Sequence, residues 1–281
     1  MLDRFTDQIK ELGPSDPFNL ALAAEREGNC SEAERLYEES AARWNTMAMV
    51  NLGVMLIERE DSKDKAVSLF QRAADGGNDS GMRNMGYVNA IGLGVPLNKE
   101  EGIRWYRMAA ERGNAKAQCN LAVILRHGKY TPKNYDEALK WNVLSAEAGY
   151  FRAQVNLALM YMNGEGTPKD TSKAFYWNTA AANNGSPRGM HNLALMYIGG
   201  EGTAVDTVKA EDLLRTAADK GYAKAMYILG DLLRNEGKEN EAFYLFESGA
   251  SKGEQRCIDA LAAAGRPVPG HAGRMKRKRS A

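Results

Sequence analysis

The sequence predicts an all-α protein, a right-handed α-α superhelix (solenoid) of about seven helix hairpins. A motif that opens with a small residue and continues with Asn, then Leu or Met, then Gly or Ala, recurs every 36 residues. A second pattern of aromatic and small residues fills the interval between its copies. Repeats with a period of roughly 20–50 residues are typical of solenoids. Both patterns place apolar residues three and four positions apart, which is the spacing of an amphipathic helix.

The first helix of each hairpin carries the motif. Its regular copies define 36-residue repeats that are clearest over residues 81–224, and two related segments flank them. A small residue five positions into each copy, such as Gly86 or Gly230, allows neighbouring helices to approach to roughly 8–10 Å. The copies begin at Ala48, Gly81, Ala117, Ala153, Gly189 and Ala225, the last with Ile in place of Asn.

The second helix has start and stop signals at the same spacing. A residue able to cap a helix N-terminus precedes each copy, and a Gly suited to the left-handed position follows it. Glu three residues after Ser31, Asn98 and Asn134 predicts capping boxes at these positions. The capping residues of the regular repeats are Asn98, Asn134, Asp170 and Asp206, and the glycines are Gly113, Gly149, Gly185 and Gly221.

The ends of the chain depart from the 36-residue pattern. The hairpins at 18–46 and 225–256 have shorter loops, and residues 257–264 predict a final short helix. Terminal repeats of a solenoid are commonly atypical because they cap the stack. We therefore expect a solenoid over residues 1–265 and a basic flexible tail over 266–281.

The net charge of +1 is unevenly distributed. The tail holds six Lys or Arg and no acid; removing these from the 37 bases leaves 31 against 36 Asp and Glu. The solenoid is thus mildly acidic and the tail strongly basic. Such a tail cannot bury enough apolar surface to fold alone.

The motifs resemble those of the Sel-1-like repeat family, a relative of the tetratricopeptide repeat. The resemblance covers most of residues 48–256 and rests on the Asn-containing opening, on loops such as Gly164-Glu-Gly166, on the aromatic of the second helix (Trp105, Trp141), and on the closing Ala-Ala and Gly. It implies a non-enzymatic adaptor or scaffold for protein partners. It also implies that the first helix of every hairpin lines the concave face.

The sequence offers no constellation for catalysis, metal binding or a cofactor, so we predict a protein that is not an enzyme. The three cysteines are widely separated lone thiols, and only three histidines occur. A hydrolase is disfavoured because no base accompanies a nucleophile in any repeat. The mean hydropathy of −0.49 and the absence of a signal peptide or long apolar run favour a cytoplasmic protein without a membrane span.

Two polar rows on the first helices are the candidate partner-binding site. In the central repeats a base precedes the motif Asn by four positions, so both lie on one helix face. The amides would hydrogen-bond the backbone of an extended peptide, and the cations would engage carboxylates. A cation in the first turn interacts unfavourably with the helix macrodipole, at a cost of ~0.3–1 kcal/mol. Four such placements in register therefore need an explanation. The rows are Lys116, Arg152, Arg188 and Lys224, and Asn84, Asn120, Asn156 and Asn192.

A packing interpretation of both rows stays open. The amides could bond an adjacent hairpin and the bases could simply solvate a helix start, because repeat positions are duplicated whether or not each copy is used.

The tail cluster also has alternatives. It could be a solvated terminus, a nuclear-import signal that would place a eukaryotic protein in the nucleus, or an arm for nucleic acid or anionic lipid. The cluster consists of Lys276, Arg277, Lys278 and Arg279.

The predicted function is a protein-protein interaction adaptor that binds an extended or acidic partner segment on the concave face. The alternative is a nucleic-acid-associated protein that acts through the basic tail and the concave cations. Steep salt dependence of nucleic-acid retention would mark this alternative.

Overall fold

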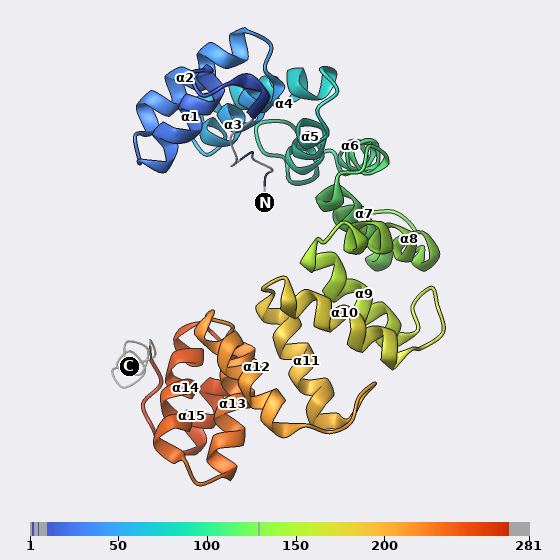
Figure 1. Cartoon of the computed structure of the whole chain (residues 1–281), viewed down its shortest axis with the longest axis vertical. Helices are drawn as coiled ribbons and strands as arrows, with labels where there is room; N and C mark the ends of the chain where they lie inside the picture. Colours follow the sequence, from blue (N-terminus) through green and yellow to red (C-terminus); the bar gives the residue numbers. More distant parts are fainter. Residues whose placement is uncertain (1, 3–4, 6–9, 129, 270–281) are drawn as a thin grey trace, which may run out of the picture. The chain divides into compact units, whose positions relative to one another are not determined.

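The computed structural model describes residues 2, 5, 10–128 and 130–269, and the regular structure in this part of the chain is entirely helical (Figure 1). Fifteen α-helices are present among the described residues. Their bounds are α1 (Pro17–Arg26), α2 (Cys30–Ala42), α3 (Thr46–Leu56), α4 (Lys63–Asp75), α5 (Asp79–Ile91), α6 (Lys99–Glu111), α7 (Ala115–His127), α8 (Tyr135–Glu147), α9 (Phe151–Asn163), α10 (Thr171–Asn183), α11 (Pro187–Gly199), α12 (Thr207–Asp219), α13 (Ala223–Asn235), α14 (Glu239–Ser251) and α15 (Gln255–Ala263).

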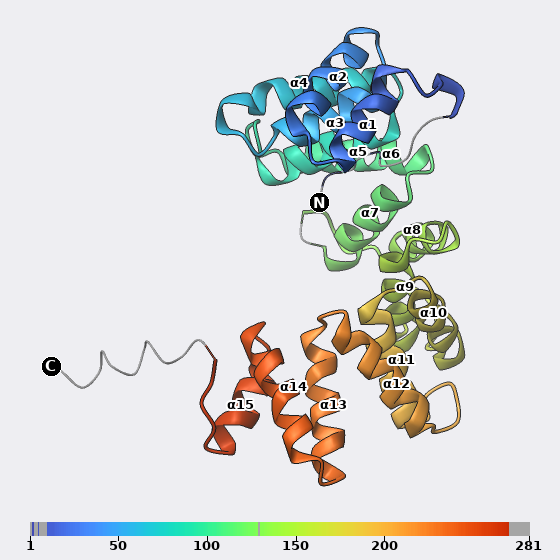
Figure 2. The same ribbon diagram turned by 60° about the vertical axis from the view of Figure 1, so that its left-hand side comes forward.

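The described helices confirm the predicted fold class. Helices α1 to α14 pair into seven hairpins, and α15 follows as the final short helix. The two helices of a hairpin pack against each other. Within each unit, helices that follow one another in different hairpins pack together as well, as α14 and α15 do in Figure 2.

The chain forms two compact units. The first spans residues 1–148 and holds α1 to α8; the second spans residues 149–281 and holds α9 to α15. Each unit contains whole hairpins, so each buries its own apolar faces.

The ends of the second helices confirm the predicted signals. The Asn98 side chain accepts a hydrogen bond from the Glu101 N–H at 3.0 Å, and Asp170 accepts one from the Lys173 N–H at 2.9 Å. The other two predicted capping residues act in the same way. The four predicted glycines have φ between +80° and +92°, a region that favours glycine.

One of the two hydrogen bonds of the predicted capping boxes is wrong, namely the bond from the backbone N–H of the capping residue to the Glu side chain. The backbone N–H of Asn98 donates to the carbonyl of Asn89 at 2.9 Å, and that of Asn134 donates to Leu125 at 3.0 Å. These N–H groups are therefore satisfied by the preceding helix of the same hairpin, and the Glu side chains pair with Arg instead.

The start of α2 also differs from its prediction. Asn29, and not Ser31, caps this helix, because the Asn29 Oδ1 accepts from the Glu32 N–H at 3.3 Å. The helix consequently begins at Cys30, and Ser31 lies within its first turn.

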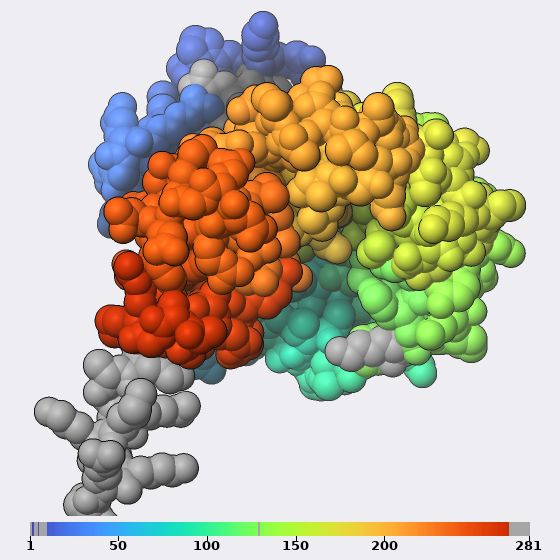
Figure 3. Space-filling view, turned by 90° about the horizontal axis from the view of Figure 1, so that it is seen from below, coloured from blue at the N-terminus to red at the C-terminus, as the bar shows by residue number. Residues whose placement is uncertain are grey.

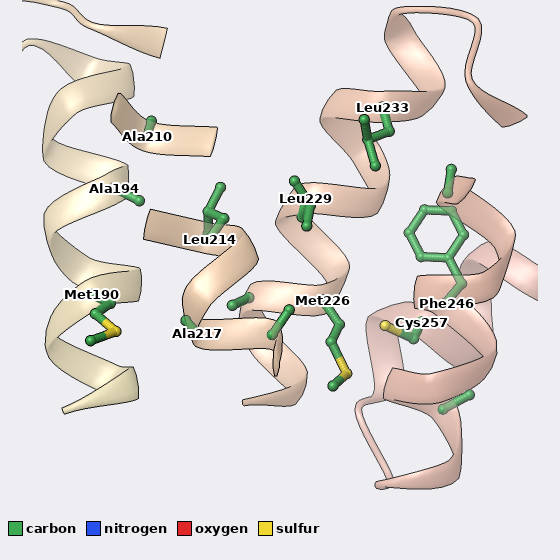
Figure 4. Packing of buried hydrophobic residues seen from close by; sticks show 14 of the residues in the cluster. Met190, Ala194, Ala210, Leu214, Ala217, Met226, Leu229, Leu233, Phe246 and Cys257 are labelled. Atoms are coloured by element: carbon green, nitrogen blue, oxygen red, sulfur yellow. The ribbon is translucent and has the colours of Figure 1, made fainter. Parts of the chain in front are cut away.

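Apolar side chains from successive helices form the core of the second unit. Figure 4 shows Ala194, Leu214, Leu229, Phe246 and Cys257, one from each of α11 to α15, lying between the helices. All five are at most 1% exposed. In the space-filling view of Figure 3, the atoms of the C-terminal helices (orange to red) form one continuous surface. Within this unit each hairpin thus buries its apolar face on the next, as repeats that cannot fold alone must do.

Glycines in the first helices permit the close contact within a hairpin. A Cβ atom on Gly230 would lie 2.6 Å from the Phe246 ring, and one on Gly86 would lie 2.7 Å from the Tyr106 ring. Since real Cβ contacts are longer, only Gly lets these rings lie flat against the helix backbone.

We expect Gly230→Ala to destabilise the second unit by about 1–3 kcal/mol, because the new methyl group overpacks the contact with Phe246. The matched control is Gly199→Ala, at the end of α11, where the added Cβ meets only the flexible Glu201 side chain at 3.4 Å. This control should be neutral or slightly stabilising. Urea unfolding followed by circular dichroism measures both, and equal midpoints for the two variants would contradict the packing account.

Candidate partner-binding site

The predicted basic row occupies one helix position that is repeated along the chain. Lys116, Arg152, Arg188 and Lys224 are each the second residue of their helix (α7, α9, α11 and α13), and all four are exposed. The first N–H groups of a helix lack intrahelical acceptors, and this end carries a partial positive charge. Each cation therefore adds to a position that already favours an anion.

Three of these cations belong to the second unit: Arg152, Arg188 and Lys224. None of the three forms an ion pair with another described residue. Their charges are thus not neutralised within the described part of the chain.

The structure adds a further cation that the sequence analysis missed. Arg256 is the second residue of α15 and is exposed, so it continues the row. Its Nε donates to Glu254 at 2.8 Å, and its guanidinium lies 4.5 Å from the centre of the Tyr227 ring. The 36-residue period does not reveal it, because the loop between α13 and α14 is short and moves Arg256 to 32 residues after Lys224.

A buried histidine lies among these cations. His191 of α11 is 6% exposed, its ring centre lies 5.4 Å from that of Tyr222, and its Nδ1 has no hydrogen-bond partner among the described residues. Burial is the main cause that lowers the pKa of His191 to about 4. The imidazole is therefore neutral at pH 7. The charged neighbours that act on this pKa are Arg256, Lys224 and Arg188, which lower it, and Glu254, which raises it.

The asparagine row makes hydrogen bonds between hairpins. The Asn192 Nδ2 donates to the Asn178 Oδ1 at 3.4 Å, and the Asn120 amide bonds the hydroxyl of Tyr106, whose pKa burial raises to about 12. In both cases the partner lies fourteen residues earlier, on the second helix of the preceding hairpin. These bonds favour the packing interpretation, but an amide has two donors and two acceptor sites, so one bond does not exhaust it.

The remaining two amides differ in burial. Asn84 is fully buried, and its Oδ1 accepts from the Arg83 Nη1 at 3.4 Å. Phe70 stands fourteen residues before it and offers no polar partner. Asn156 is half-buried, like Asn120. Burial thus leaves Asn84 the least accessible member of the row.

The structure shows no site geometry for the other predicted features. The tail cations Lys276, Arg277, Lys278 and Arg279 lie outside the described residues. Among the residues that are described, no group of three His, Cys, Asp or Glu is placed to hold a metal ion. No described helix has the length and apolar character needed to cross a bilayer.

Solved structures share this arrangement of helices. A Sel1 repeat protein from Oxalobacter formigenes is 25% identical, with a TM-score of 0.73; the match covers 84% of this chain and 97% of that one. The protective antigen c5321, present in uropathogenic Escherichia coli strains, displays an SLR fold and is 26% identical, with a TM-score of 0.71. That match covers 88% of this chain and 56% of the antigen.

The sequence itself matches the Sel1 repeat family model in six consecutive segments, residues 46–78, 79–114, 115–150, 151–186, 187–222 and 223–254. No protein with a curated description matches the chain. Sel1 repeats generally mediate protein-protein interactions, and their solenoids generally serve as scaffolds without catalytic activity. The six matched segments follow one another without a gap over well over half of the chain, which therefore belongs to the Sel1 repeat family.

Proposed function

We propose that this protein is a non-enzymatic scaffold that captures an acidic, extended segment of a protein partner on its row of first-helix cations. The observation that carries the proposal is the group of exposed cations at the starts of α11, α13 and α15, which act together on the buried His191. Glu254 pairs with Arg256, but Arg188 and Lys224 form no ion pair with a described residue, so their like charges still repel one another. A carboxylate-bearing segment would supply a neutralising anion.

The helix geometry favours carboxylates at this row. Each cation stands in the first turn of its helix, so a carboxylate there meets both a positive side chain and the positive end of the helix dipole. The half-buried amide of Asn192 donates to Asn178, and its remaining donor and acceptor sites could bond a peptide backbone. The cations would thus steer and hold the acidic side chains, and the amides would hold the backbone.

Reversing the row to Glu at Lys116, Arg152, Arg188 and Lys224 should weaken partner capture. Exposed ion pairs contribute roughly 0.2–1 kcal/mol each, so four together correspond to a loss of affinity of at least about fourfold. Helix content should not fall, because an acid in the first turn suits the macrodipole. Affinity capture from native lysate, with circular dichroism of each variant, measures both effects.

The control set reverses four exposed cations elsewhere that make no ion pair with described residues: Lys133, Lys140, Lys169 and Lys220. It carries the same change in net charge but lies off the row. Equal losses from both sets, or none from either, would contradict the proposal. If deletion of residues 266–281 abolishes retention, and nucleic acid is released from the wild type at higher salt, the nucleic-acid alternative is established instead.

The pKa of His191 should report an anion at the row. In the free protein we expect titration near pH 4, since burial and the cations disfavour the imidazolium. An acidic peptide, for example six consecutive glutamates, would offset the cations and raise this pKa. By linkage the peptide should then bind more tightly as the pH falls from 7 towards 5, until its own carboxylates begin to protonate.

Proton NMR titration with and without the peptide measures this shift. His191→Val identifies the resonance, since Val155 occupies the equivalent position one repeat earlier. A midpoint near 6.5 in the free protein, or an unchanged midpoint at saturating peptide, would contradict the expected electrostatics.

A further inference from the structure

A cavity of about 440 Å³ lies in the second unit, where it is lined by the helices α12, α13 and α14. This volume falls within the range of roughly 300–1,000 Å³ that is common for ligand pockets. The floor is apolar, because the buried Leu229 and Leu233 of α13 form it (Figure 4). The rim is polar and consists of Arg215, Asp219, Asn240, Glu241 and Tyr244.

The preceding pair of hairpins fills the equivalent space with aromatic rings. Phe175 of α10 and Tyr197 of α11 pack edge to face, with ring centres 5.4 Å apart. The Lys209 ammonium of α12 lies 5.5 Å from the centre of the Tyr197 ring. One hairpin later, the residues at the same helix positions are Glu211, Leu233 and Glu241. Two rings are thus missing from the later contact, and an acid replaces the cation.

The loop between α13 and α14 leaves the cavity uncovered. The corresponding loop between α11 and α12 has seven residues, 200–206, and a Cβ atom on its Gly202 would lie 2.3 Å from the Thr171 carbonyl oxygen of α10. That loop therefore lies directly on the preceding hairpin. The loop after α13 has three residues, 236–238, and a Cβ atom on Gly237 would meet nothing within 4 Å. The missing rings and the short loop together account for the cavity.

The rim carries an excess of negative charge. Asp219 forms no hydrogen bond or ion pair with another described residue, and Glu241 has a single long contact of 3.9 Å with Arg215 in this part of the chain. Arg215 is itself paired with Glu211 of its own helix at 2.6 Å. The nearby Lys238 is also paired, 2.7 Å from a carboxylate of its own loop. The carboxylates of Asp219 and Glu241 are therefore available to an external cation.

Two further rim residues favour a guanidinium on a peptide. The side chain of Tyr244 is 73% exposed, so a guanidinium can stack on its ring. Asn240 is exposed and makes no hydrogen bond with a described side chain, so its amide can bond a peptide backbone. Arginine combines an apolar stem with a planar cation that bonds carboxylates and stacks on aromatic faces. Its chemistry matches the leucine floor and the acidic, aromatic rim.

We propose that this cavity is a second partner-binding site, which takes an arginine side chain presented by a protein segment. The stem packs on Leu229 and Leu233, where the preceding hairpins place a ring, and the guanidinium lies between Asp219 and Glu241. The cavity selects a charge opposite to that selected by the cation row, and second helices supply its rim. The inference therefore goes beyond the proposed function and does not rest on it.

Titration of the ¹⁵N-labelled full chain with a capped tripeptide, acetyl-alanyl-arginyl-alanine amide, tests the site. At millimolar peptide, the amide signals of the residues that line the cavity should shift and saturate. The same tripeptide with citrulline keeps the shape of arginine but lacks its charge, and it should bind at least about twofold more weakly. Equal affinities for the two tripeptides, or no saturable shift at the cavity, would overturn the proposal.

Neutralising the two carboxylates separates recognition from folding. Asp219→Asn combined with Glu241→Gln should lower the affinity for the arginine tripeptide at least about twofold and leave that for the citrulline tripeptide unchanged. The matched control is Asp212→Asn combined with Glu239→Gln, which removes one carboxylate from each of the same helices outside the cavity. The charge assignment is wrong if both pairs of substitutions weaken the arginine tripeptide equally.

Refilling the cavity tests its volume. Leu233→Tyr introduces the residue that stands at the same position of α11, and it should abolish the saturable shifts from both tripeptides. Unaltered binding to this variant would contradict a site inside the cavity. If circular dichroism shows that the variant is unfolded, the carboxylate substitutions decide the question.

Propylguanidine, the arginine side chain without a backbone, tests the source of the ligand. It should bind more weakly than the arginine tripeptide, because Asn240 then has no peptide group to bond. Tighter binding of propylguanidine would overturn the assignment to a protein segment.

The cavity and the cation row fail separately. Loss of saturable arginine binding counts against this inference alone, because the titration with acidic peptide reports on the row through the pKa of His191. An unchanged pKa of His191 counts against the proposed function alone.

Discussion

The hairpin contact between a small residue and a flat side chain is the constraint on which the other features depend. Gly53, Gly86 and Gly230 each lie where a Cβ atom would meet the ring of the second helix, at 2.5–2.7 Å. The helices of these hairpins pack closely only because the Cβ is missing. In the other copies the same position holds Ala122, Ala158 or Ala194, so every copy has a small residue where the two helices meet. Side chains at one position, such as the second residue of the helix, then form a row within a unit.

The motif asparagines form hydrogen bonds that connect neighbouring hairpins. Asn51, Asn120 and Asn192 each bond a residue fourteen positions earlier, which ties neighbouring hairpins together. Asn51 uses the rest of its amide for the backbone of Phe5. The amide of Asn51 therefore bonds both a neighbouring helix and the backbone of residue 5.

Local signals in the sequence predicted most of the fold, because caps and repeat spacing are short-range. The exceptions have physical causes. The spacing between Ser31 and Glu34 predicts a cap at Ser31. Asn29 is the cap instead, because its side chain accepts the Glu32 N–H in the first turn of α2. Arg256 escaped the 36-residue period because a shortened loop moved it. The contact between Phe5 and Asn51 joins residues 46 positions apart and involves only backbone atoms of Phe5. No residue pattern in the sequence therefore predicts it.

Mapping of backbone amide shifts tests the central claim most directly. The ¹⁵N-labelled full chain is titrated with an acidic segment of a captured partner, and each amide signal is followed. The account predicts the largest shifts in the first turns of α9, α11, α13 and α15, beside the cations of the second unit. Shifts concentrated on the second helices α8, α10, α12 and α14 would contradict it and place the partner on a different surface.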